Sequence, residues 1–167
     1  MAAILETARL TAEPVAAADA SFMRALLTSR GFVENIGDRG VRSDADALAY
    51  IERLQAHYRD HGFGMWLVRR RADAEPVGLA GLLKREVLEH VDVGYAFLES
   101  AWGQGYAQEI AAACVRYAQA VLGLPAVAAI TSVGNLASRR VLEKVGLRFV
   151  DVRQLPGWDE PSAYYLV

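Results

Sequence analysis

The chain has 167 residues, 53% of them apolar and 23% charged, and a formal net charge of −2, which fits one globular domain with a sizeable core. Its 18 basic residues form no long block, so we expect no nucleic-acid partner. No apolar stretch approaches the ~20 residues that span a bilayer, and Glu6 and Arg9 interrupt the opening segment, so we expect neither a membrane span nor a signal peptide. The single cysteine, Cys114, leaves no internal disulfide and favours a reducing, cytoplasmic location.

Strand-like and helix-like patterns alternate through the first half of the chain. Residues 8–15 have the pattern of a short strand ending at Pro14, and the apolar spacing that follows predicts a helix that ends at Gly31. An N-cap at Ser43 and a stop at Gly62 bound a second helix. Two apolar runs within residues 64–86, on either side of a polar connection, predict a β-hairpin, and residues 90–100 supply a third strand.

The second half continues the alternation. An apolar stripe through Ile110, Cys114 and Ala118 predicts a helix after Gly105. Residues 125–133 predict a strand buried on both faces, residues 135–146 a short capped helix, and residues 147–155 and 162–167 two closing strands. The pattern therefore predicts an α/β (α+β) fold around one mixed sheet.

The stretch SAWGQGYAQEI, residues 100–110, carries the clearest functional pattern. Gly103, Gly105 and Ala107 place small residues between a strand and a helix, where free N–H groups and the helix dipole favour a phosphate. A turn that only lets the helix and strand pack closely explains the same glycines.

Two phosphate-binding classes fail at a required residue. A nucleotide P-loop needs Gly-Lys-Ser/Thr, but Tyr106 and Ala107 follow the second glycine. A dinucleotide fold needs an acidic residue about 20 positions on, and no Asp or Glu lies between Glu109 and Glu143.

Two stretches at a characteristic separation, VDVGYAFLESAWGQGYAQEIAAACVRYA and NLASRRVLEKVGL, resemble the GNAT acyltransferases, in the branch similar to RimJ and RimL. The family's loop, Gln/Arg-x-x-Gly-x-Gly/Ala, falls on Trp102, Gly105 and Ala107, with Trp102 as the departure. The resemblance covers nearly the whole chain. It implies one GNAT domain over residues 1–167, with a mostly antiparallel sheet of about seven strands, splayed at the cofactor site, and about four helices.

The resemblance also implies acetyl-CoA as the cofactor. Its pyrophosphate would lie on the backbone of the glycine loop, and its pantetheine arm along the strand that ends near Phe97, which is splayed from the strand at 126–133. The cofactor-binding residues that we expect are Ala96, Phe97, Leu98, Trp102, Gly103, Gln104, Gly105, Tyr106, Ala107, Asn135 and Ser138.

Acetyl transfer to an amine needs a polarised carbonyl, a base and a proton for the leaving thiolate. A backbone N–H near Ala96 or Phe97 could polarise the carbonyl. Asp92 aligns with a carboxylate common in this branch and is our candidate base, with Glu89 as the second. An exposed or ion-paired strand carboxylate is the alternative interpretation of Asp92.

The proton donor follows from the resemblance as well. The tyrosine that many GNAT enzymes use as the acid falls on Leu142, so the resemblance assigns that role to Ser138, three residues after Asn135. The alternative is that Ser138 only hydrogen-bonds its own helix turn.

These residues predict an acetyltransferase that acts by direct transfer on a primary amine, in a small molecule or at a protein N-terminus. We expect residues 32–42 and Trp158 to shape the acceptor groove, and we leave a homodimer open. His57 and His61 lack the glutamate of a zinc-protease helix, so we expect no metal. A non-catalytic acyl-CoA-binding or regulatory domain is the alternative, which Leu142 slightly favours.

Overall fold

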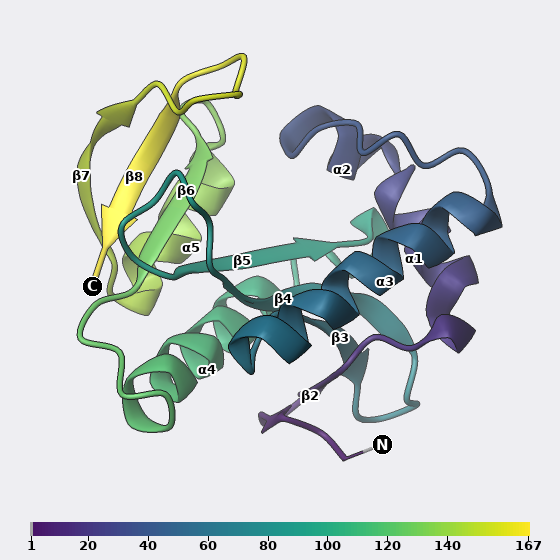
Figure 1. The fold of residues 1–167 in the computed structure, drawn as a ribbon. Coiled ribbons are helices and arrows are strands. Elements are labelled where there is room, and N and C mark those ends of the chain that lie inside the picture. Colours follow the sequence, from purple (N-terminus) through teal and green to yellow (C-terminus); the bar gives the residue numbers. More distant parts are fainter. Residues whose placement is uncertain (1) are drawn as a thin grey trace.

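An eight-stranded sheet runs through the protein, with helices packed on both of its faces (Figure 1). The computed structural model describes residues 2–167. The strand order is β1-β2-β3-β4-β5-β6-β8-β7, and every neighbouring pair is antiparallel except β5 and β6, which are parallel. The predicted α/β (α+β) class with a mixed, mostly antiparallel sheet is confirmed. The described residues form eight strands in place of about seven, and five α-helices in place of about four.

The elements have the following bounds. The strands are β1 (Leu5–Glu6), β2 (Leu10–Glu13), β3 (Met65–Arg70), β4 (Pro76–Leu83), β5 (Asp92–Phe97), β6 (Ala128–Ser132), β7 (Arg148–Arg153) and β8 (Ser162–Leu166). The α-helices are α1 (Ala20–Leu27), α2 (Arg30–Asn35), α3 (Asp44–His61), α4 (Tyr106–Ala120) and α5 (Leu136–Val145), and two short 3-10 helices cover Ala17–Asp19 and Glu99–Ala101.

Capping residues fix the ends of α3 and α5 as predicted. The Ser43 hydroxyl accepts the N–H of Asp46 at 3.1 Å, and Gly62 ends α3 in the left-handed conformation with φ of 80°. At α5 the Asn135 side chain accepts the N–H of Ser138 at 3.2 Å, and Gly146 ends the helix with φ of 108°.

The predicted helix end at Gly31 is wrong. Helix α1 ends at Leu27, and Ser29 caps a new short helix that contains Gly31. A Cβ at Gly31 would lie 2.5 Å from the Trp102 ring. Glycine therefore serves close packing at this position and does not end the helix.

The extra strand lies at the N-terminus. The single strand predicted over residues 8–15 is the second half of a hairpin, in which β1 pairs with β2. In its turn, the Leu10 N–H donates to the Thr7 hydroxyl at 3.1 Å. Periodicity could not show β1, because it has only two residues.

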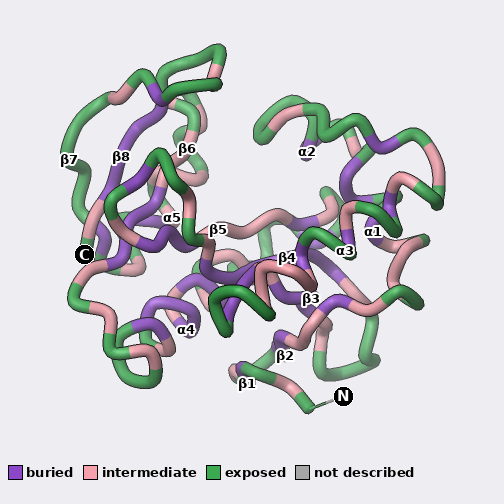
Figure 2. Tube along the Cα trace, in the orientation of Figure 1, coloured by how far each residue is buried: buried purple, intermediate pink, exposed green. Residues whose placement is uncertain are grey.

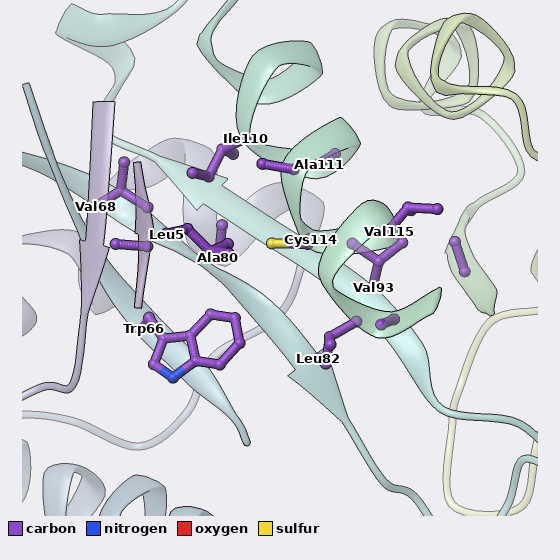
Figure 3. Packing of buried hydrophobic residues seen from close by; sticks show 14 of the residues in the cluster. Leu5, Trp66, Val68, Ala80, Leu82, Val93, Ile110, Ala111, Cys114 and Val115 are labelled. Atoms are coloured by element: carbon purple, nitrogen blue, oxygen red, sulfur yellow. The ribbon is translucent and has the colours of Figure 1, made fainter. Parts of the chain in front are cut away.

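Two apolar layers hold the helices against the sheet, and the central strands are buried from both sides (Figure 2). On one face, α1 and α3 pack over Leu67 and Leu79. On the other face, Ile110 and Cys114 of α4 pack over β3, β4 and β5, as Figure 3 shows, with Trp66 of β3 in the same cluster. These layers hold the middle of the sheet in place beside the junction at which two strands separate.

That junction lies between β5 and β6. The two strands are paired only at Asp92 and Ala128, where the Ala128 N–H donates to the Val91 carbonyl at 2.8 Å, and beyond this point they separate. The prediction that residues 125–133 are buried on both faces holds only for residues 127–129. Pro125 is exposed, and from Ile130 onward the strand is half-buried or exposed, where it runs along the opening. The splay implied for this part of the sheet is present.

Candidate functional site

The glycine loop ends in a row of backbone donors. Gly103 and Gly105 have φ of 76° and 79°, a left-handed conformation that side chains with a Cβ rarely adopt. Gly105 immediately precedes α4, and the N–H groups from Gly105 to Gln108 have no acceptor among the described residues. Free donors at the positive end of a 15-residue helix suit an anion.

Basic side chains surround this helix terminus. The guanidinium of Arg9 lies 4.7 Å from the centre of the Tyr106 ring, and its Nε donates to Glu109 at 2.8 Å. This contact helps to hold the β1–β2 hairpin against α4. A hollow of about 480 Å³ beside the loop is lined by Arg9, Gly105, Gln108, Glu109, Ala112, Arg116, Lys144 and Val145. Its three cations and one carboxylate, which Arg9 already binds, favour a polyanionic ligand.

The separation of β6 leaves one edge of β5 without a strand partner. Because hydrogen bonding alternates along an antiparallel pair, the bond from the Leu98 N–H to the Val77 carbonyl (3.0 Å) turns Ala96 and Leu98 toward β4. The same alternation turns Tyr95 and Phe97 toward the opening, where their N–H groups have no acceptor among the described residues. Of the three strand residues predicted to bind the cofactor, Phe97 therefore presents a free amide, whereas Ala96 and Leu98 do not.

Trp102 connects the loop to the helical layer. Its indole N–H donates to the Phe97 carbonyl at 3.0 Å, and its ring packs against Gly31 of α2. Glu99 accepts the Gly31 N–H at 2.8 Å. Half of Trp102 is exposed. At the family's Gln/Arg position this chain therefore has a residue that holds α2 against the loop.

Asp92 lies at the start of β5, where the two strands separate. Its side chain is 2% exposed, and it accepts the Arg85 Nε at 3.0 Å. Burial outweighs the Arg85 charge and raises the pKa of Asp92 from 3.8 to about 6. The Arg85 guanidinium in turn lies 5.5 Å from the centre of the Trp158 ring, in the β7–β8 connection. The candidate base is thus both buried and ion-paired.

Ser138 lies on α5, on the other side of the opening. Its Oγ is 2.9 Å from the hydroxyl of Tyr95, which projects from the free-edged part of β5. Among the described residues, Tyr95 is the only hydrogen-bond partner of this Oγ, so Ser138 does not bond its own helix turn. Leu142, at the family's tyrosine position, is buried in the core.

The second candidate base and the carboxylates near the expected acceptor groove differ in whether they have a charged partner. Glu89 is exposed in the β4–β5 connection, and its side chain has no polar partner among the described residues. Asp38 is ion-paired with Arg42, which lowers the pKa of Asp38 to about 2. Asp159 and Glu160 are exposed beside Trp158. Residues from α1 and the α2–α3 segment also line a hollow of about 330 Å³, namely Arg24, Leu27, Thr28, Val33, Asp38, Val41 and Arg42.

Other chemically suggestive residues have structural partners. Both ring nitrogens of His57 bond to backbone, Nδ1 to the Phe63 carbonyl at 2.7 Å and Nε2 to the Lys84 N–H at 3.1 Å. Cys114 is fully buried, which raises the pKa of its thiol to about 12. Residues 2–167 contain neither a cluster of side chains suited to a metal ion nor a helix long and apolar enough to cross a membrane.

Three features of the site were not predicted from the sequence: the partner of Asp92, the partner of Ser138 and the group of basic residues beside the loop. Arg85 stands seven residues before Asp92, in the connection that leads into the strand. A search of that connection for a charge opposite to Asp92 could have suggested the pair. Nothing in the sequence around Tyr95 distinguishes it from a packed strand aromatic. The basic residues Arg9, Arg116 and Lys144 lie too far apart in the chain for any local pattern to group them.

Comparison with known proteins now identifies the family. The model of the acetyltransferase (GNAT) domain matches residues 9–148. An uncharacterized N-acetyltransferase of Bacillus subtilis, YoaA, is 28% identical over 87% of this chain and 82% of its own length. An acetyltransferase structure from Agrobacterium tumefaciens has a TM-score of 0.83 at 24% identity, covering 98% of this chain and 92% of that one.

The same fold occurs in RimL, a ribosomal L7/L12 α-N-protein acetyltransferase solved in complex with coenzyme A. Its TM-score is 0.85 at 15% identity, over 99% of this chain and 97% of that one. The resemblance seen in the glycine loop and the Asn135 helix is confirmed. The chain belongs to the GNAT acetyltransferases, enzymes that depend on acetyl-CoA.

Proposed function

We propose that this acetyltransferase transfers the acetyl group directly to a primary amine held in the opening between β5 and β6. One observation carries the proposal: the free edge of β5 runs from the free helix terminus of α4 toward a buried carboxylate. An extended ligand on that edge would reach both an anion site and a proton acceptor. The acceptor class comes from this chemistry and from the family resemblance.

The residues around the loop fit acetyl-CoA. The N–H groups from Gly105 to Gln108 would receive the pyrophosphate, and Arg116 and Lys144 add positive charge beside them. The Phe97 N–H would bond the pantetheine arm as an added strand does. When bound, acetyl-CoA supplies an acetyl group activated as a thioester.

A backbone amide of β5 would polarise the acetyl carbonyl. With the Phe97 N–H assigned to the pantetheine arm, this role goes to the Tyr95 N–H, which faces the opening on a strand fixed by the β4 ladder. Preorganised donors of this kind stabilise the negative charge that develops on the carbonyl oxygen. We assign this role to the backbone, so no side-chain substitution removes it.

Asp92 takes the proton that the attacking amine loses. Its side chain is almost fully buried, so the proton reaches it through a water and not by direct contact. With a pKa of about 6, the carboxyl is ionised near neutral pH and remains basic enough to accept that proton. Arg85 holds the carboxylate and keeps it charged.

Ser138 donates a proton to the thiolate as the carbon–sulfur bond breaks. The new carbon–nitrogen bond replaces that bond, and the proton lost by the amine leaves through Asp92 to solvent. The Ser138 oxygen regains a proton from solvent, so the overall change is one amide and one thiol formed.

On the acceptor side, we propose that the α2–α3 segment and the β7–β8 connection bound the groove. Asp159 and Glu160 are exposed there and could attract a cationic amine, whereas Asp38 is already ion-paired. The small-molecule amine and the protein N-terminus both fit this chemistry. We further propose that residues 1–167 act as one domain and that the enzyme works in a reducing compartment, since Cys114 is free and buried.

The test is turnover on a panel of small amines, polyamines, amino acids and peptides with free N-termini. Release of free CoA should accompany acetylation of at least one class, identified by mass spectrometry, and Asp92→Asn should lose it. Tight binding of acetyl-CoA with no turnover on any amine would contradict the proposal.

A further inference from the structure

Ser138 depends on a neighbour for its orientation. A serine on a helix ordinarily turns its hydroxyl back to a carbonyl of its own preceding turn. Here the Oγ instead meets the hydroxyl of Tyr95 at 2.9 Å, and the same Tyr95 hydroxyl lies 3.2 Å from the Ser138 carbonyl. Two contacts from one phenol therefore fix both the side chain and the backbone of Ser138.

The position of this contact ties it to the reaction. Tyr95 comes from the part of β5 that β6 has left, and Ser138 comes from the helix that follows β6. The bond thus crosses the opening from one side to the other. The backbone N–H of Tyr95 faces the same opening.

We propose that Tyr95 is a positioning residue that holds the Ser138 hydroxyl for proton donation, in place of the tyrosine that this chain lacks at Leu142. This inference rests on the proposed function. The Tyr95 hydroxyl donates its one hydrogen to the Ser138 carbonyl, so between the two hydroxyls the serine donates and the phenol oxygen accepts. When the serine's hydrogen moves to the departing sulfur, the phenol hydrogen turns from that carbonyl to Ser138 Oγ. As that hydrogen leaves, the bond from Tyr95 stabilises the oxygen that remains.

The protonation state of the phenol suits this role. Burial raises the pKa of Tyr95 to about 12, so the hydroxyl keeps its hydrogen at every pH at which the enzyme would work. The cause is its half-buried site between β5 and α5, where it also packs against the main apolar cluster.

The experiment uses Tyr95→Phe, which keeps the ring and removes only the hydroxyl, together with Ser138→Ala and the double variant. We expect Tyr95→Phe to lower kcat about tenfold or more, with the KM for acetyl-CoA changed less than threefold. The double variant should match Ser138→Ala within twofold, because Tyr95 acts through Ser138.

Tyr117→Phe is the matched control. Tyr117 is also half-buried, packs edge-on against Trp66, and its hydroxyl has no partner among the described residues. It should retain wild-type kcat and KM, and both single variants at position 95 and 117 should keep the wild-type melting temperature within a few degrees.

The results for Tyr95 can be distinguished from a failure of the proposed function. If the wild type turns over and Tyr95→Phe is equally active, the role of Tyr95 is overturned and the proposed function is not. The same holds if the losses from Tyr95→Phe and Ser138→Ala add in the double variant. A wild-type protein that binds acetyl-CoA and acetylates no amine overturns both.

Discussion

The two ends of the candidate site differ in the kind of group that each presents: backbone N–H groups at the start of α4, and side chains around Asp92 and Ser138. At the α4 end, the proposed binding half, the groups assigned to the ligand are backbone N–H groups beside left-handed glycines, and their geometry follows from the local chain. At the Asp92 end, the proposed chemical half, proton transfer is assigned to side chains whose state is set by distant partners, Arg85 for Asp92 and Tyr95 for Ser138. The binding half can therefore be altered through conformation, and the chemical half only through its partners.

The largest expected effect breaks the binding half alone. Gly105→Val should weaken CoA binding about 100-fold or more, roughly 3 kcal/mol, because a β-branched residue does not hold φ of 79° and its Cβ would approach Arg9 Nη2 at 3.4 Å. Calorimetric titration with CoA measures this. Gly123→Val is the control, since φ there is 67° and the added Cβ meets no atom within 4 Å. It should lose similar stability and keep its CoA affinity; equal affinity in both variants would refute the phosphate assignment.

A substitution at Asp92 should remove catalysis and leave CoA binding intact. Asp92→Asn should lower kcat/KM about 100-fold, within the usual range for a lost general base, while the Kd for CoA stays within threefold. Wild-type kcat should rise with pH through about 6 and then level, and the variant should lack this limb.

Glu89→Gln serves as the comparison for Asp92→Asn. Its carboxylate is exposed and lies outside the Asp92–Arg85 pair, so we expect less than a threefold loss. A larger loss at Glu89 than at Asp92 would reverse the assignment of the base.

Stability against pH sharpens the same contrast. Because folding raises the pKa of Asp92 from 3.8 to about 6, its contribution to stability is fully present below pH ~4 and is lost as the pH rises through 6. Between pH ~4 and 6 the wild type should therefore lose up to about 3 kcal/mol of unfolding free energy relative to Asp92→Asn, whose amide does not titrate. Urea unfolding at pH 4 and pH 7.5 measures it. A difference that is independent of pH would mean that Arg85 fully offsets the burial of the charge.

The smallest effect falls at the junction of the two halves. Asn135→Ala removes the acceptor of the Ser138 N–H and should cost about 1 kcal/mol, or roughly 2–4 °C in melting temperature. Ser43→Ala removes the equivalent cap of α3, far along the chain from Ser138. Both should melt earlier, but only Asn135→Ala should also lose turnover. Equal turnover in the two variants would limit Asn135 to capping.

The sequence predicted the glycine loop and both ends of α5 because local rules determine them. Glycine placement, the Asn135 cap and the Gly146 stop each depend on a few neighbouring residues, and the structure has them where they were expected. The helix after Gly105 was equally clear, since Ile110, Cys114 and Ala118 are all fully buried in one stripe.

The chemical half could not be predicted in the same way. Tyr95 and Ser138 are 43 positions apart, and no periodicity in either element indicates that they meet. Gly31 misled for a related reason, because the ring that requires a glycine there belongs to Trp102. Asp92 and Ser138 were candidates through the family resemblance, and Glu89 through its place beside the same strand. The partners of Asp92 and Ser138 came from the fold.

The burial of Cys114 gives the molecule a built-in reporter. Its thiol is the only one in the chain, lies at the centre of the layer between α4 and the sheet (Figure 3), and has a pKa of about 12. The native enzyme should therefore give no background with thiol reagents, so such reagents can follow CoA release continuously. The same reagents should label Cys114 only when this core opens, so the labelling rate of each variant measures its opening free energy.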